Sequence, residues 1–237
     1  MKKGVDKMDF GDYYEAYWKN RKEKEPEPIE PIRSVIPGLL VKYSSYGAIL
    51  NQIPENVEVL DIGCGDGNVS SLYLKKACKV TGMDISEKAL EYAAKRGIGT
   101  LNWDINEAPL PLKNNSFDVI VFSDALEHTI DPVCLLKEVY RVLKQDGKVI
   151  LSVPNFGRLS NRLRMLIGDP IDLLHFSKYG DEVEHLHWFT KPKIKFLMHQ
   201  VGFKKIELIP VGLPFGFLFG RLNLHGFGDF LLVRGVK

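Results

Sequence analysis

The sequence reads VLDIGCGDG from Val59 to Gly67, an apolar run of strand length that leads into three glycines at alternate positions. Glycines directly after a buried strand let the backbone turn tightly and let a ligand approach the chain closely. A plain strand-to-helix turn has the same glycine pattern, so the glycines alone do not identify a binding site. The acidic residues of the loop indicate which kind of ligand it could bind. Asp61 and Asp66 would repel the pyrophosphate that a dinucleotide places at a helix N-terminus. Position 68, where a dinucleotide fingerprint has its third glycine, is Asn68. The loop therefore favours a ligand with a cationic head.

Around this loop, apolar runs of strand length alternate with segments of helical periodicity. Strands that alternate with helices pair in parallel through right-handed crossovers, which gives a doubly wound α/β fold. The last two apolar runs have no obvious helix between them, so we expect them to pair antiparallel at the sheet edge. The pattern predicts a mostly parallel, seven-stranded sheet with an antiparallel last strand. The expected strands cover residues 57–62, 79–84, 100–103, 117–122, 148–153, 203–211 and 229–236, and the expected helices cover residues 68–77, 86–97, 131–147 and 190–202.

The ends of the chain and one insertion differ from this regular pattern. We expect residues 1–47 to form an aromatic arm and a linker, because a Tyr- and Trp-rich run (10–21) precedes a charged stretch with several prolines (23–37). The domain proper then covers residues 48–237. Within it, the irregular insertion 156–189 is expected to form a lid.

The composition excludes several classes of protein. With 45% hydrophobic and 26% charged residues, the 237-residue chain is neither disordered nor fibrous. A net charge of +2 is too small to indicate a nucleic-acid or anionic-membrane partner. Three cysteines without Cys-x-x-Cys spacing argue against a disulfide framework and a structural zinc site. The sequence has no apolar leader and no run of the ~20 apolar residues that a membrane span needs, so we expect a cytoplasmic protein.

Acidic residues end three consecutive strands of the expected sheet. Asp84 ends the second strand, 23 residues after Asp61, and Asp104 follows the third. Open α/β sheets bind ligands along this edge, and a carboxylate there can accept hydrogen bonds from ribose hydroxyls or from the amine of adenine. Ile85 and Ile105 lie beside these carboxylates, in position to sandwich the adenine ring. A helix cap or a solvated turn would explain each aspartate alone, but the series predicts a nucleoside with a cationic head, such as S-adenosylmethionine.

Five segments between residues 57 and 155 carry a family resemblance: VLDIGCGDG (59–67), GMDIS (82–86), NWDIN (102–106), SFDVIVFSDALEHTIDP (116–132) and LLKEVYRVLKQDGKVILSVPN (135–155). In order and spacing they resemble the class I S-adenosylmethionine-dependent methyltransferases. The resemblance implies a Rossmann-like fold and S-adenosylmethionine as the cofactor. It also implies that the glycine loop contacts the methionine part, Asp84 the ribose, and the residues around Asp104 the adenine. The cofactor-binding residues implied in this way are Asp61, Gly63, Cys64, Gly65, Asp84, Ile85, Asp104, Ile105 and Ser123.

Two subfamilies are similar to different parts of the chain. The LEH-x-x-DP run (126–132), followed by SVPN (152–155) and HLHWFT (185–190), resembles the type 11 small-molecule methyltransferases that include the ubiquinone-biosynthesis O-methyltransferases. This resemblance implies methyl transfer to oxygen or nitrogen of a small-molecule acceptor. The segment PNFGRLSNRLRMLIGDP (154–170) resembles the methionine-biosynthesis protein W family. The second resemblance implies a non-catalytic partner or regulator in a biosynthetic complex.

Methyl transfer requires that the enzyme hold and align the nucleophile, and that it remove a proton where the nucleophile is a hydroxyl. His128 is the candidate base, because histidine titrates near neutral pH, and Glu127 and Asp124 are placed to orient it or to bind substrate. A packing histidine beside the adenine is the alternative for His128. We expect His187, in the lid, to face the pocket. His185 and His187 together offer two metal ligands, but no third appears at a recognisable spacing, so we predict no metal site.

Overall fold

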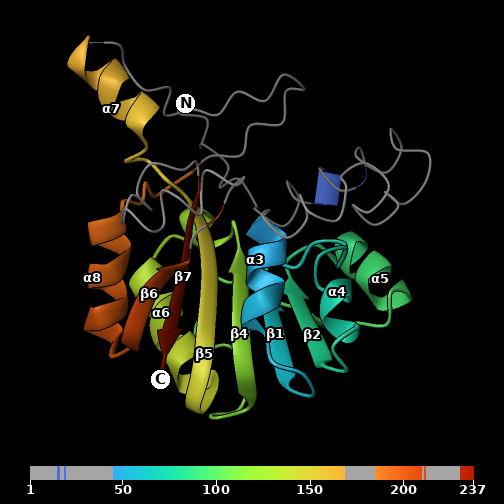
Figure 1. Ribbon diagram of the computed structural model, residues 1–237. Helices are drawn as coiled ribbons and strands as arrows, with labels where there is room; N and C mark the ends of the chain where they lie inside the picture. The colour runs from blue at the N-terminus through green and yellow to red at the C-terminus, as the bar shows by residue number, and fades with distance from the viewer. Residues whose placement is uncertain (1–14, 17–18, 20–44, 169–184, 210, 212–229) are drawn as a thin grey trace, which may run out of the picture.

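The computed structural model describes residues 15–16, 19, 45–168, 185–209, 211 and 230–237. Within this part of the chain, seven strands form one sheet in the order β3-β2-β1-β4-β5-β7-β6. Neighbouring strands are parallel except for β7, which is antiparallel to both β5 and β6. The predicted α/β fold with an antiparallel last strand is thereby confirmed (Figure 1). The strands are β1 (Glu58–Ile62), β2 (Lys79–Asp84), β3 (Gly99–Asn102), β4 (Phe117–Ser123), β5 (Leu143–Pro154), β6 (Lys204–Ile209) and β7 (Phe230–Val236).

Helices cover both faces of the sheet (Figure 1). Successive side chains of a strand point to opposite faces. Val59 of β1 therefore belongs to a buried cluster with Ile49, whereas its neighbour Leu60 belongs to a second cluster with Leu136 and Ile194. Because the central strands are buried on both sides, their polar carboxyl-terminal ends are the places left for a site. The helices are α3 (Ser45–Gln52), α4 (Ser71–Leu74), α5 (Glu87–Lys95), α6 (Pro132–Val142), α7 (Leu159–Leu166) and α8 (Lys191–Val201), with a short 3-10 helix, η1 (Leu126–His128).

Three helix starts that the sequence predicts are confirmed by their caps. The Ser86 hydroxyl accepts a hydrogen bond from the third residue of α5, and the Asp131 carboxylate accepts two from the first turn of α6. The Thr190 hydroxyl accepts one from α8. Gly97 follows α5 and Gly202 ends α8, both with the positive φ that favours glycine, 85° and 110°. Local side-chain chemistry therefore sets these helix boundaries.

Two predicted helices are too long. The expected helix 68–77 reduces to the single turn of α4, because the Ser70 hydroxyl donates to Asp61 and the Ser71 hydroxyl to a backbone carbonyl, which holds the preceding residues in turns. Helix α6 ends at Val142 rather than at residue 147. The chain is already extended at Leu143, which pairs with Phe117 before the register shifts, so the intervening residues form an irregularity in β5.

The predicted arm and lid are described only in part. Most of residues 1–47 and the middle of the lid, 169–184, lie outside the described residues, so the domain boundaries stay a prediction. Helix α3 spans the expected boundary between arm and domain, and α7 stands away from the sheet (Figure 1). The end of the lid returns to the domain where Phe189 pairs with Asn155, directly after β5. Among the described helices, none is long and apolar enough to cross a membrane.

Candidate active site

The glycine loop is held tightly at the carboxyl end of β1. The backbone N–H groups of Gly63 and Cys64 both donate to the carbonyl of Met83, at 2.8 and 3.1 Å, which ties the loop to β2. Gly63 has a φ of 72°, and a Cβ placed on it would lie only 2.9 Å from the Cβ of Ala125. Gly67 has a φ of 73°, and a Cβ there would lie 2.5 Å from the Ile98 side chain. The structure therefore requires glycine at both positions, because the backbone has a positive φ and the loop packs too closely against its neighbours to leave room for a side chain.

Asp61 lies beneath this loop and is 2% exposed. Its Oδ2 accepts a 2.6 Å hydrogen bond from the Ser70 hydroxyl, whereas its buried Oδ1 has no hydrogen-bond partner among the described residues. The pKa of the Asp61 carboxyl is raised from 3.8 to about 7, mainly by burial; the nearby charge of Asp84 contributes to the rise, and the Ser70 hydrogen bond opposes it. An unpartnered buried carboxylate oxygen is costly unless a donor or a cation reaches it. This atom therefore fits the ammonium group of a cationic ligand.

Asp84, at the end of β2, connects the glycine loop to α5. One carboxylate oxygen accepts from the backbone N–H of Gly65 at 2.8 Å, and the other from that of Ser86 at 3.0 Å. Each oxygen of an ionised carboxylate can accept more than one hydrogen bond, so acceptor capacity remains for a ligand. Burial raises the pKa of Asp84, and the charge of Glu15, from the N-terminal arm, contributes to this rise. Glu15 also accepts from the backbone N–H of Lys88 at 3.2 Å, which brings a residue of the arm to the start of α5.

The residues expected around the adenine lie after β2 and β3. Asp104 is half-buried, and its Oδ1 accepts two hydrogen bonds from Asn106, at 2.8 and 3.0 Å. Ile85 and Ile105 are half-buried, and the carbonyl of Ile85 accepts from the Asn102 side chain at 2.8 Å. Their roles toward a cofactor stay predictions. Cys64 is held by a contact between its thiol and the carbonyl of Gly65, and burial raises its pKa, which makes it a poor nucleophile.

Further polar groups gather just past the end of β4. The buried hydroxyl of Ser123 has no hydrogen-bond partner among the described residues. Asp124 adopts a positive φ of 52°, and its carboxylate accepts a 2.8 Å hydrogen bond from the Ser152 hydroxyl of β5. Burial raises the pKa of Asp124. Glu127 is 1% exposed, and its pKa rises from 4.5 to about 8 because of burial and of the negative charge of Asp124.

The end of the lid meets this group. The ring centroids of His128 and His185 are 4.9 Å apart. The backbone N–H groups of Leu186 and His187 both donate to the carbonyl of Glu127, at 2.9 and 3.1 Å. The ring of His187 lies elsewhere, with its Nε2 3.3 Å from the carbonyl of Ile130. The structure thus places His185 against His128. From the sequence we expected His187 to face the pocket, and nothing in the His-Leu-His pattern distinguishes His185 from His187.

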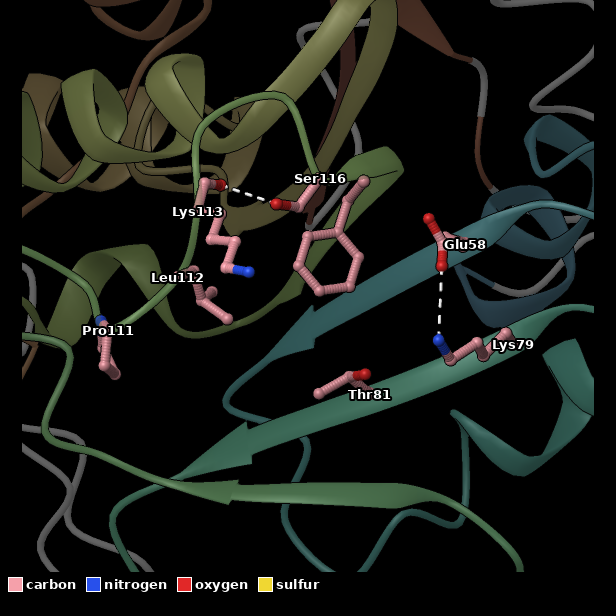
Figure 2. A pocket seen from close by; sticks show the side chains of 8 residues that line it. Glu58, Lys79, Thr81, Pro111, Leu112, Lys113 and Ser116 are labelled. Atoms are coloured by element: carbon pink, nitrogen blue, oxygen red, sulfur yellow. Dashed lines mark hydrogen bonds and ion pairs between the residues drawn. The ribbon is translucent and has the colours of Figure 1, made fainter.

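A separate hollow lies at the opposite edge of the sheet (Figure 2). Its volume is about 290 Å³, and it opens near the amino-terminal ends of β1, β2 and β4. Glu58 and Lys79 form an ion pair of 3.3 Å in its wall. None of the predicted site residues lines this hollow, so it is distinct from the acidic strand ends. Its lining residues are Glu58, Lys79, Thr81, Pro111, Leu112, Lys113, Ser116 and Phe117.

Comparisons with known proteins agree with this arrangement. Residues 60–151 match the model of a methyltransferase domain family. A ubiquinone/menaquinone biosynthesis C-methyltransferase of Desulfotalea psychrophila is 36% identical over 97 residues, which are 39% of this chain and 39% of the relative. A ubiquinone biosynthesis O-methyltransferase of Coxiella burnetii is 28% identical over 151 residues, 62% of this chain and 60% of the relative. The chain thus spans less than two thirds of the length of these two relatives.

Solved structures show the same fold. A crystal structure from Thermotoga maritima, described as a possible histamine N-methyltransferase, has a TM-score of 0.62 and 21% identity, and the match covers 95% of this chain and 99% of that one. Phosphoethanolamine N-methyltransferase 2 of Haemonchus contortus, solved with S-adenosylmethionine, has a TM-score of 0.56 and 19% identity, covering 81% of this chain and 52% of that one.

The fold and the acidic strand ends define a doubly wound α/β domain of the class I methyltransferase type. Together with the match of residues 60–151 to a methyltransferase domain family, they make this part of the chain similar to the S-adenosylmethionine-dependent methyltransferases. The unpartnered Oδ1 of Asp61 suits the ammonium group of S-adenosylmethionine. The remaining acceptor capacity of Asp84 suits ribose hydroxyls.

Proposed function

We propose that this chain transfers the methyl group of S-adenosylmethionine to a small organic molecule, at a hydroxyl oxygen in preference to nitrogen. The observation that carries the proposal is the buried, unpartnered Oδ1 of Asp61 beneath a glycine loop in which added side chains would clash. A cationic donor offsets the cost of burying this carboxylate, whereas a pyrophosphate would increase it. The preference for oxygen is supported by the similarity to a ubiquinone biosynthesis O-methyltransferase over 62% of the chain.

When bound, S-adenosylmethionine supplies an electrophilic methyl carbon, to which the acceptor bonds as the carbon–sulfur bond breaks and the electron pair remains on sulfur. The residues of the chain bind and orient the two reactants. Asp61 holds the cationic end of the cofactor, and Asp84 accepts from its ribose. Gly65 donates its backbone N–H to Asp84 at 2.8 Å, which fixes this carboxylate under the loop before the cofactor arrives. Such preorganisation reduces the cost of aligning the methyl group.

The acceptor half of the site lies past β4. Asp124 is held by the Ser152 hydroxyl in a left-handed backbone conformation, a strained arrangement of the kind that functional sites retain. His128 is the candidate proton acceptor for a hydroxyl substrate, and Asp124 the candidate group that orients that substrate. His187 is a candidate for contact with the acceptor from the lid, although its Nε2 lies beside the carbonyl of Ile130. A hydroxyl must lose its proton during methyl transfer, so a base or an equivalent group is needed on this side.

Two measurements test the proposal. Titration calorimetry with S-adenosylhomocysteine measures cofactor binding, and release of S-adenosylhomocysteine on a panel of hydroxylated aromatic acceptors measures turnover. We expect binding in the micromolar range and turnover on at least one hydroxylated acceptor, weakened by His128→Ala. The matched control is His199→Ala, which changes an exposed histidine at the end of α8. Absence of binding at millimolar ligand would refute the proposal. Binding without turnover on hydroxyl or amine acceptors would favour a methyltransferase-like regulatory partner instead.

A further inference from the structure

Glu127, His128 and His185 form a compact group of side chains at the acceptor end of the site. One carboxylate oxygen of Glu127 and one ring nitrogen of each histidine lie within 4.8 Å of one another. Glu127 is buried, and the two histidines are half-buried. Two atoms that each lie about 2.1 Å from one metal ion are at most about 4.2 Å apart. Side-chain rotations that move the tips by about 1 Å would therefore bring all three groups onto a common ion.

The Glu127 carboxylate supplies a second and independent reason to expect a ligand. Glu127 is 1% exposed, and its buried Oε2 has no hydrogen-bond partner among the described residues. Burial of a carboxylate without a partner costs several times more than burial of a neutral group. The nearby Asp124 is also acidic and adds unfavourable negative charge. A bound cation compensates for both carboxylates at once.

We propose that Glu127, His128 and His185 bind one divalent transition-metal ion. Two imidazole nitrogens and one carboxylate oxygen suit Zn²⁺, Co²⁺ and related ions, whereas Mg²⁺ and Ca²⁺ prefer oxygen ligands. This set differs from the pair His185 and His187, for which the sequence shows no third ligand at a recognisable spacing. Two of the three ligands, Glu127 and His128, come from η1 after β4, and only His185 comes from the lid, far away in the sequence.

The backbone holds the ligand set together across this separation. The N–H groups of Leu186 and His187 donate to the carbonyl of Glu127, so the residue after His185 is bonded directly to one ligand. The same segment continues into Phe189, which is fully buried and pairs with Asn155. His185 is therefore presented to His128 by a fixed backbone. Metal binding would join the end of the lid to the loop after β4.

Three protein ligands leave coordination positions open, as in catalytic metal sites. The site lies beside Asp124, on the acceptor side of the candidate active site. A hydroxyl bound to the ion becomes more acidic and can release its proton to solvent. In the metal-loaded protein His128 would therefore be a ligand, and the role of base proposed for it above would apply to the metal-free protein. This chemical role rests on the proposed function, whereas metal binding itself does not.

The test is a Co²⁺ titration of the full chain after chelation of bound metals. We expect one Co²⁺ per chain with visible d–d absorption, displacement by Zn²⁺, and no competition from an equal concentration of Mg²⁺. Glu127→Gln, His128→Ala and His185→Ala should each weaken Co²⁺ binding at least ~10-fold. Glu127→Gln preserves side-chain shape, and circular dichroism confirms that each variant is folded. His187→Ala and His199→Ala are the matched controls and should leave Co²⁺ affinity unchanged.

Two results would overturn the metal site. The first is absence of a Co²⁺ spectrum in the full chain, and the second is binding lost in His187→Ala but retained in His128→Ala. Titration of the metal-free protein with S-adenosylhomocysteine separates this proposal from the proposed function. Cofactor binding without Co²⁺ binding refutes the metal site alone. Co²⁺ binding without cofactor binding upholds the metal site and refutes the methyltransferase proposal.

Discussion

Replacing Asp61 with asparagine should remove a pH-dependent loss of stability from the ligand-free protein. Asp61 is 2% exposed, and its carboxyl has a pKa of about 7 in place of 3.8. The difference is about 3 pH units, and each unit corresponds to about 1.36 kcal/mol, so ionised Asp61 lowers the free energy of unfolding by about 4 kcal/mol. The asparagine side chain carries no charge at any pH and therefore does not have this cost.

The sign follows from proton binding. Because the pKa of Asp61 is higher in the folded than in the unfolded chain, the folded state binds more protons between about pH 4 and pH 7. The contribution of Asp61 to stability therefore falls as pH rises through this window and is lowest above pH 7. Urea unfolding between pH 4 and pH 8, with a chelator present, measures the free energy for both proteins. We expect the difference, wild type minus Asp61→Asn, to fall by about 4 kcal/mol across the range.

A second variant checks that the effect belongs to this carboxyl. The Ser70 hydroxyl donates to Asp61 at 2.6 Å and lowers its pKa, so Ser70→Ala should move the pH-dependent window upward. Ser70 is fully buried and small, so the change leaves little empty space. If wild type and Asp61→Asn instead show parallel stability curves from pH 4 to pH 8, the carboxyl is not held in the buried, unpartnered state that the reasoning requires.

Three further substitutions give simpler outcomes. Asp84→Ala should weaken S-adenosylhomocysteine binding at least ~10-fold in calorimetry, because the ribose loses a buried acceptor; unchanged affinity would place the ribose elsewhere. Asp131→Ala should lower the free energy of unfolding by about 1 kcal/mol in urea, since the cap of α6 is lost, whereas Asp131→Ser should retain most of it. Arg141→Lys should cost about 1–3 kcal/mol in the same assay, because the guanidinium binds Glu138 and two backbone carbonyls before β4; a neutral result would make these bonds dispensable.

The elements that the sequence predicts well are those whose limits depend on neighbouring residues. The caps at Ser86 and Asp131 lie within three residues of the N–H groups that they bind, so their patterns are visible in a short window. The α4 helix is shorter than predicted for the opposite reason. Ser70 donates to Asp61, nine residues earlier, and that contact depends on how β1 packs against the following turn. The early end of α6 likewise depends on the pairing of Leu143 with Phe117.

The residues of the candidate site also differ in how far the sequence predicts their positions. Asp61 and Asp84 could be placed together from the sequence, because the carboxyl ends of adjacent parallel strands meet at one edge. Glu127 and His185 are separated in the sequence by α6, β5 and most of the lid, and no periodicity relates them. Their proximity depends on hydrogen bonds from the end of the lid to the carbonyl of Glu127. From the sequence alone, His187, two residues after His185, is an equally good candidate to approach Glu127.

Asp61 and Glu127 share a property that links stability to function. Each is almost fully buried, and each has one carboxylate oxygen without a hydrogen-bond partner among the described residues. Neither group helps the ligand-free protein to fold, because a buried acceptor loses its hydration without compensation. A fold retains such groups where an occupant supplies the missing partner, and the two occupants proposed are both positively charged. Unfavourable electrostatic free energy in the ligand-free site is therefore relieved when the ligands bind. Substitutions that neutralise these carboxylates should stabilise the ligand-free protein and weaken ligand binding.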